Sequence, residues 1–212
     1  MATSSSANRV GRPRDLAKRA AIIEAAIGLF TGRNYEMVTM ESVAAKAGVA
    51  KMTVYSHFCD KDTLFEAVVS GISEKMVRGL RRFDSEELPL RQRLTNIGTA
   101  FLTVTLNLHV ASSAHSLPAA WRGDPVLRMR LYNAGPGRTI GALTEILDRA
   151  AAQNELSVDC AALAAQDLVG LWEAGLPARI AFGLLEPPTA EDVERRASRG
   201  TDIFLRAFAN RN

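Results

Sequence analysis

The sequence predicts an all-α protein, built from an N-terminal three-helix domain and a larger C-terminal helical bundle. Apolar residues recur at spacings of three and four along most of the chain, and no segment shows the alternation that is typical of a strand. Capping residues, glycines and prolines divide these apolar stretches into about nine helices. The 212 residues, 47% of them apolar, are enough for one large or two small packed domains.

The N-terminal end, residues 1–14, is expected to be a flexible basic arm, because it is rich in serine and has almost nothing apolar to bury. A helix is predicted from Asp15, since the next apolar residues form one stripe, and the run Gly32-Arg33-Asn34 should end it. The stripe consists of Leu16, Ala20, Ile23, Ile27 and Phe30.

Residues 15–61 are expected to form a helix-turn-helix domain. Two short helices are predicted at about 40–47 and 51–57, with Thr39 as the N-cap of the first and Gly48 in the tight turn between them. Asp60 can cap a fourth helix. Two short helices that meet at a glycine-containing turn are an arrangement with which proteins enter the major groove of DNA.

The remaining residues, 62–212, are expected to form the helical bundle. A long helix is predicted at about 90–108, and Asp124 followed by Pro125 should start another that ends before the glycine and proline residues at 135–137.

Three more helices are expected to follow. Residues 138–152 form the first, and residues 159–185 form the second, which Gly175 should kink. The third opens at Thr189, which resembles a capping box together with Asp192.

Positive charge is concentrated in the first part of the chain, although the net charge of the whole chain is only +3. Residues 1–83 hold 13 Lys and Arg against 8 Asp and Glu, whereas residues 84–212 hold 13 against 15. This asymmetry favours a module that faces a polyanion, joined to a part with another task. A difference of a few charges is weak support for nucleic-acid binding by itself.

Several classes of protein are excluded by what the sequence lacks. No stretch approaches the roughly 18 apolar residues that a membrane helix needs, and the N-terminus has no apolar segment of a secretory signal. Cys59 and Cys160 do not have the spacing of a zinc site or a disulfide framework, and His109 and His115 lack that of a metal pair. Neither G-x-S-x-G, nor H-E-x-x-H, nor a glycine-rich phosphate loop is present. We therefore expect a cytoplasmic protein that is not an enzyme and has no metal or cofactor.

The second helix of the pair carries side chains suited to DNA. Lys51 can reach a phosphate or the edge of a guanine, and Thr53 offers a hydroxyl and a methyl group for a phosphate or a thymine methyl. Tyr55 and His57 present polar tips that suit phosphate oxygens. Lys61 is unfavourably placed in the dipole of its own helix, which makes sense if Lys61 and the exposed amides there share a phosphate.

Residues 43–64, V-A-x-x-A-G-V-x-x-x-T-x-Y-x-H-F-x-x-K-x-x-L, resemble the signature of the TetR/AcrR family of bacterial transcriptional regulators. The resemblance covers residues 16–70, and the phrase L-Y-N-A-G-P-G-R-T-I at 131–140 is similar to an AefR-like subset. It implies a homodimeric repressor whose two helix-turn-helix domains, one from each subunit, bind a palindromic operator in double-stranded DNA. It also implies a C-terminal part with a dimer interface and a cavity for a small-molecule effector. Binding of the effector would move the fourth helix and change the distance between the two helix-turn-helix domains.

Six residues match positions that contact DNA in this family: Thr39, Lys51, Thr53, Tyr55, His57 and Lys61. Two positions depart from the family pattern. Ala50 stands where a capping serine is frequent, so a phosphate contact from that side chain is absent. Met52 stands where glycine, proline or a polar residue is frequent, and can touch thymine methyl groups or simply be exposed.

The arm sequence Gly11-Arg12-Pro13-Arg14 resembles the hooks with which some proteins enter the minor groove. Arg12 and Arg14 would then read a narrow, A·T-rich groove. The alternative is a disordered tail that adds only charge.

The C-terminal part is expected to hold a ligand pocket and a dimer interface. Its polar and aromatic residues can line a pocket for a hydrophobic effector or belong to the core or surface; those assigned to the pocket are Phe101, His109, Trp121, Tyr132 and Trp172. The resemblance favours an intersubunit four-helix seam over the subunit's own core for Leu168, Leu171, Ile203, Phe204 and Phe208. Two alternatives stay open: a DNA-binding regulator that senses no ligand, and an enzyme that uses the C-terminal cavity.

Overall fold

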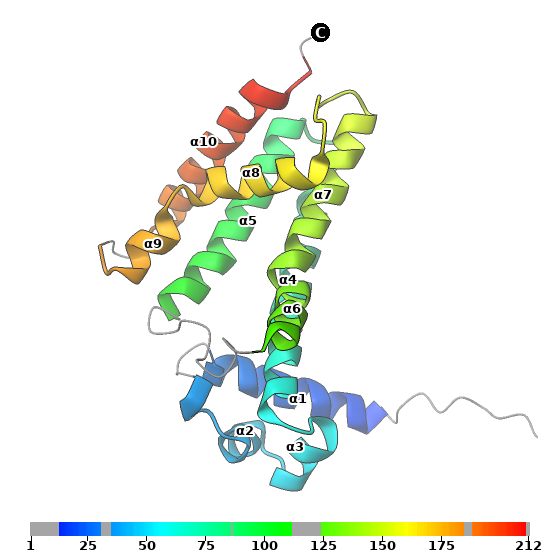
Figure 1. Ribbon diagram of the computed structural model, residues 1–212, viewed down its shortest axis with the longest axis vertical. Helices are drawn as coiled ribbons and strands as arrows, with labels where there is room; N and C mark the ends of the chain where they lie inside the picture. The colour runs from blue at the N-terminus through cyan, green and yellow to red at the C-terminus, as the bar shows by residue number, and fades with distance from the viewer. Residues whose placement is uncertain (1–12, 31–34, 86, 112–123, 185–187, 211–212) are drawn as a thin grey trace, which may run out of the picture. The chain divides into compact units, whose positions relative to one another are not determined.

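A computed structural model describes residues 13–30, 35–85, 87–111, 124–184 and 188–210 (Figure 1). These ranges contain ten α-helices and no strand, and one isolated bridge joins Leu156 to Ala209. The all-α prediction is confirmed. By its internal contacts the chain divides into two compact units, Met1–Val68 and Val69–Asn212.

The first unit contains α1 (Pro13–Phe30), the 3₁₀ turn η1 (Tyr35–Met37), α2 (Met40–Ala47), α3 (Lys51–His57) and the start of α4 (Lys61–Phe83). Thr39 caps α2 as predicted. Its hydroxyl accepts a hydrogen bond from the Ser42 amide at 3.1 Å, and the Ser42 hydroxyl accepts one from the Thr39 amide at 3.1 Å. Gly48 adopts a left-handed φ of 66°, which ends α2 and turns the chain toward α3.

Helix α1 begins at Pro13, before the predicted start, because the fixed φ and missing N–H of proline suit the first turn of a helix. Arg14 therefore lies in α1 and not on the predicted arm, whereas Arg12 lies outside the described residues. The buried face of α1 also differs from the predicted stripe. Leu16 is 58% exposed, and the core side chains are Ile22, Ala25, Ala26, Leu29 and Phe30. Between residues 20 and 27 only Glu24 is not apolar, so spacing alone could not select the face.

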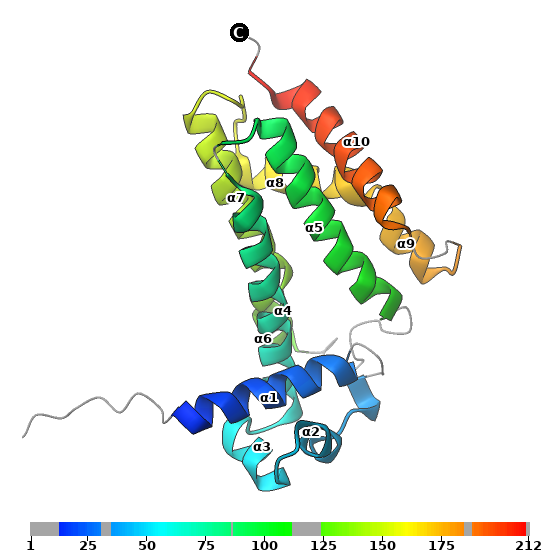
Figure 2. The same ribbon diagram turned by 180° about the vertical axis from the view of Figure 1, so that it is seen from behind.

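The second unit contains the rest of α4, α5 (Leu90–Ala111), α6 (Pro125–Ala134), α7 (Pro136–Ala152), α8 (Ala161–Glu173), α9 (Leu176–Ala181) and α10 (Ala190–Phe208). Helices α5 and α10 lie side by side, and α8 packs against α7 and α10 (Figures 1 and 2). Two predicted caps are confirmed. Asp124 accepts hydrogen bonds from two amides in the first turn of α6, and Thr189 forms a capping box with Asp192 at α10.

The described residues contain one more helix than expected, because the helix predicted at 159–185 is divided into α8 and α9. Ala174 and Gly175 both adopt left-handed backbone conformations, with φ of 39° and 79°. Two successive left-handed residues cannot continue a right-handed helix, so the kink predicted at Gly175 is a complete break.

We expect Ala174→Gly to raise the free energy of unfolding by about 1 kcal/mol, because the left-handed region penalises a β-carbon and not glycine. The measurement is urea unfolding followed by circular dichroism. Ala178→Gly, at an exposed position in α9, is the matched control and should lower stability by up to about 1 kcal/mol. A loss of stability in both variants would show that Ala174 carries no strain.

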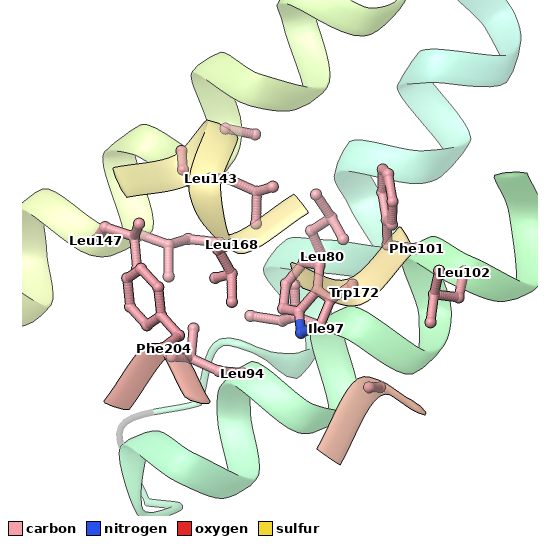
Figure 3. Close-up of a cluster of buried hydrophobic side chains, with 14 of the residues drawn as sticks. Leu80, Leu94, Ile97, Phe101, Leu102, Leu143, Leu147, Leu168, Trp172 and Phe204 are labelled. Atoms are coloured by element: carbon pink, nitrogen blue, oxygen red, sulfur yellow. The ribbon is translucent and has the colours of Figure 1, made fainter. Parts of the chain in front are cut away.

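The core of the second unit surrounds Trp172 of α8, whose side chain is completely buried (Figure 3). Its indole N–H donates to the Thr201 hydroxyl at 3.1 Å, and its ring centroid lies 5.9 Å from that of Phe101. Gly98 and Gly200 let α5 and α10 approach the indole. A β-carbon added at Gly98 would lie 2.5 Å from a ring atom, and one added at Gly200 would lie 2.8 Å from another. The indole ring therefore requires glycine at both positions.

This packing corrects three predictions for the C-terminal part. Trp172 is a core residue and does not form the wall of an open pocket. Leu168 and Phe204, predicted at a dimer seam, are fully buried in their own unit and have no side-chain surface to offer a partner (Figure 3). The apolar period of α8 and α10 could not distinguish a seam from a core, because both bury the same stripe of a helix.

The other residues assigned to the pocket and the dimer seam differ in how far they are buried. Leu171 and Phe208 are partly buried against the same core, whereas Ile203 is 37% exposed. Tyr132 is exposed on α6. The side chain of His109 and the whole of Trp121 lie outside the described residues.

Candidate nucleic-acid interface

Helix α3 is held by its inner face and leaves its outer face to solvent. Val54 and Phe58 are buried, and α3 packs against α1 and α2. On the outer face Lys51 and Tyr55 are exposed, and Met52 is 75% exposed. Burial of a large apolar side chain such as Met52 is favourable, and a thymine methyl group in the major groove is a suitable partner for it.

Lys51 is joined to a carboxylate ten positions earlier in the chain, a pairing that helical spacing does not predict. Its ammonium forms an ion pair with Glu41, in the first turn of α2, and lies 5.7 Å from the centroid of the Tyr55 ring. The hydrogen bond with Glu41 raises the pKa of Lys51, and the same bond lowers the pKa of Glu41. Both side chains are about half exposed, so the pair is weak in water and can open toward a phosphate.

His57 is largely covered by the protein. Its side chain is only 10% exposed, and its Nε2 lies 3.0 Å from a carboxylate oxygen of Asp15 in α1. This contact links the end of α3 to the first turns of α1 and so helps to position α3. A phosphate contact from His57 stays a prediction.

Lys61, in the first turn of α4, also has partners within the first unit. Its ammonium donates to the Tyr35 carbonyl at 2.9 Å and lies 4.0 Å from the centroid of the Tyr35 ring. These two interactions offset the unfavourable position of a cation at the start of a helix. The position of Lys61 at the start of a helix is therefore explained by contacts inside the protein. Its phosphate contact stays a prediction.

Tyr35 supports this end of the interface, a role that its position in the sequence does not reveal. Its ring stacks on Phe30 of α1 and meets Phe65 of α4 edge to face, and its hydroxyl donates to Asp62. Burial, and then this hydrogen bond, raises the pKa of Tyr35. The only signal in the sequence was an aromatic residue directly after the break at 32–34, and its partners lie elsewhere in the chain.

Within the described ranges, no helix is long and apolar enough to cross a membrane. The same ranges hold no group of three or more His, Cys, Asp or Glu residues that could bind a metal ion. Cys59 and Cys160 are both exposed and unbridged.

Two family models match the chain. Residues 22–68 match the model of bacterial regulatory proteins of the tetR family. Residues 92–210, more than half of the chain, match the model of the C-terminal domain of AefR-like transcriptional repressors. The first match contains α2, α3 and their turn, and the second covers most of the second unit.

Individual proteins are similar to the chain as well. The HTH-type transcriptional activator FasR of Mycolicibacterium smegmatis is 35% identical over 96 residues, which are 44% of this chain and 43% of FasR. The match thus spans less than half the length of this curated relative. A TetR-family transcriptional regulator from Mesorhizobium loti has the same fold, with a TM-score of 0.77 and 24% identity over 93% of this chain and all of its own. The flavonoid-responsive regulator FrrA has a TM-score of 0.70 and 29% identity, covering 92% of this chain and 99% of FrrA.

Proposed function

Because the chain belongs to the TetR family of DNA-binding transcriptional regulators, we propose that it is a repressor that binds a palindromic operator as a homodimer and is released by a small-molecule effector. The observation that carries the proposal is the outer face of α3, where Lys51, Met52 and Tyr55 are exposed above the buried Val54. In a helix-turn-helix protein this helix enters the major groove, where it reaches base edges and phosphates. The proposed DNA-contacting residues are Thr39, Lys51, Met52, Thr53, Tyr55, His57 and Lys61.

The experiment that tests this proposal is the selection of bound duplexes from a random DNA pool, near physiological salt. We expect a palindrome whose half-sites are centred about one helical turn apart, roughly 34–36 Å, on one face of the duplex. Failure to enrich any sequence, with binding that vanishes as salt rises, would show non-specific electrostatic binding only. A single unpaired half-site would contradict the dimer.

Repression is supported by the description of the family that residues 92–210 match. FasR is by its name an activator, so activation is the alternative. A reporter gene placed behind the recovered operator distinguishes them. Repression predicts lower expression when the protein is present, and activation predicts higher expression.

The homodimer is proposed to form through the outer faces of α8 and α10. Leu163 of α8 and Ile203 of α10 are large apolar side chains that stay exposed in the single chain. Burial of such side chains in a partner's surface stabilises association. Sedimentation equilibrium measures the mass, and Leu163→Glu should shift it from dimer toward monomer.

The effector is proposed to be a small hydrophobic molecule, in line with the flavonoid response in the name of FrrA. Release from DNA follows if the effector binds the DNA-incompetent conformation more tightly. Helix α4 begins in the first unit and ends in the second, so it provides a continuous covalent link between them. A panel of flavonoids should contain a compound that raises the melting temperature and weakens operator binding. If none does, with acyl and other aromatic compounds also tested, a regulator without a ligand is favoured.

The double variant Tyr55→Phe with Lys61→Ala should weaken binding to all duplexes and flatten the salt dependence, because both residues are proposed to contact phosphates. Fluorescence anisotropy at several salt concentrations measures both effects, and the slope should fall by about 0.9 for the lost cation. Lys75→Ala, which removes an exposed lysine from α4 in the second unit, is the charge-matched control. A change in the preferred sequence would instead make one of the pair a base reader. Urea unfolding must accompany the test, since Lys61 also binds Tyr35.

A further inference from the structure

A cavity of about 320 Å³ lies in the second unit, where α4 ends, α5 begins and α7 ends. It lies at the lower end of the volumes that bind small molecules, which are about 300–1,000 Å³. The residues that line it are all charged or polar: Arg81, Asp84, Arg93, Glu145, Arg149 and Gln153. Because most of the lining surface is polar, the ligand that fits is hydrophilic.

The inner part of the cavity is made by two buried charged side chains. Arg93, in the first turn of α5, is 5% exposed, and Asp84, just after α4, is also largely buried. Arg93 pairs with Glu155, and its Nη1 lies 3.7 Å from an oxygen of Asp84. Its Nε is buried without a hydrogen-bond partner in the described part of the chain. This buried N–H is costly, whereas the two terminal nitrogens of Arg93 are held by Asp84 and Glu155.

The rim of the cavity is made by exposed charged side chains. Arg81 pairs with Glu145 at 3.1 Å, and Arg149 pairs with Asp84. The side chains of Arg81, Glu145 and Arg149 are each more than half exposed. The Arg81–Glu145 pair is exposed on both sides and contributes little free energy in water, so an incoming anion can replace the Glu145 carboxylate with little loss.

We propose that this cavity binds a small organic carboxylate. Each guanidinium group has five N–H donors in a planar fork, and the three arginines make few hydrogen bonds with the carboxylates around them. A ligand carboxylate matches two donors of such a fork at once. Lys or a single exposed arginine would not provide this geometry, whereas here arginines from the end of α4, the start of α5 and α7 converge on one space.

The carboxylate site is independent of the proposed repressor function, because its test uses no DNA. Isothermal titration with succinate, at ionic strength matched by sodium chloride, should show saturable binding to the wild-type chain. Arg149→Ala and Arg81→Ala should each weaken succinate binding at least tenfold. Arg195→Ala, which removes an exposed arginine that pairs with Asp192 on α10, is the matched control and should bind succinate like the wild type.

Arg149→Lys provides a second variant that retains the charge but loses the fork, and it should weaken binding several-fold while leaving the melting temperature without ligand unchanged. Saturating succinate should raise the melting temperature of the wild type. Binding of inorganic phosphate in preference to succinate would overturn the assignment to a carboxylate. No binding of succinate beyond that of chloride, or equal losses in Arg149→Ala and Arg195→Ala, would leave the cavity as an ion-pair network and overturn the proposal.

Discussion

Trp172→Ala is expected to lower the free energy of unfolding by about 3–5 kcal/mol. The substitution removes the indole that fills the space between α5, α8 and α10. Gly98 and Gly200 face this ring and have no side chains with which to fill the cavity. The loss is a large part of the roughly 5–15 kcal/mol by which folded proteins are stable. Urea unfolding followed by far-ultraviolet circular dichroism measures it.

Two further variants separate the contributions to this effect. Phe182→Ala removes an exposed aromatic ring and should change stability by less than about 0.5 kcal/mol. Thr201→Val keeps the volume but leaves the indole N–H buried without its acceptor, which should cost about 1–3 kcal/mol. A loss below about 1 kcal/mol for Trp172→Ala would show that the ring faces open space, and would favour its role in a ligand pocket after all.

Lys51→Ala is expected to weaken operator binding by about 1–3 kcal/mol, which corresponds to roughly 5- to 150-fold in affinity. Lys51 is exposed at the start of α3, where a helix-turn-helix protein meets both bases and phosphates. Anisotropy titrations on the operator and on a scrambled duplex distinguish the two contacts. A guanine contact predicts a loss confined to the operator. A phosphate contact predicts the same loss on both duplexes, and unchanged affinity would remove Lys51 from the interface.

Lys51 forms an ion pair with Glu41, and Glu41→Gln is the matched variant at the other residue of this pair. The glutamine keeps the size of the side chain and releases Lys51 from the ion pair. It also removes a negative charge close to the DNA phosphate that Lys51 is proposed to contact. We expect affinity for every duplex to rise severalfold and the salt dependence to steepen. The combined variant closes a double-mutant cycle, which shows whether the pair persists on DNA. Weaker binding of Glu41→Gln to the operator alone would instead make Glu41 a reader of cytosine.

Much of the first unit could be predicted from short stretches of sequence. Thr39 forms its predicted cap within α2, and Gly48 adopts the left-handed conformation that a tight turn needs. The short helices predicted at about 40–47 and 51–57 are found as α2 and α3. Caps, turns and the face of a short amphipathic helix depend on residues within about four positions of one another, so the local sequence contains the necessary information.

The sequence by itself therefore determined the helix-turn-helix pair, most helix boundaries and the family of the chain. Only the tertiary structure decided which face of α1 is buried, and that Leu168 and Phe204 lie in the core of their own unit. It also decided the partners of charged residues. Lys61 binds Tyr35 across 26 positions, and Arg93 meets Glu155 across 62 positions. The physical reason is that helical periodicity fixes which side chains share a face, whereas the element that covers this face is chosen by the packing of the whole chain.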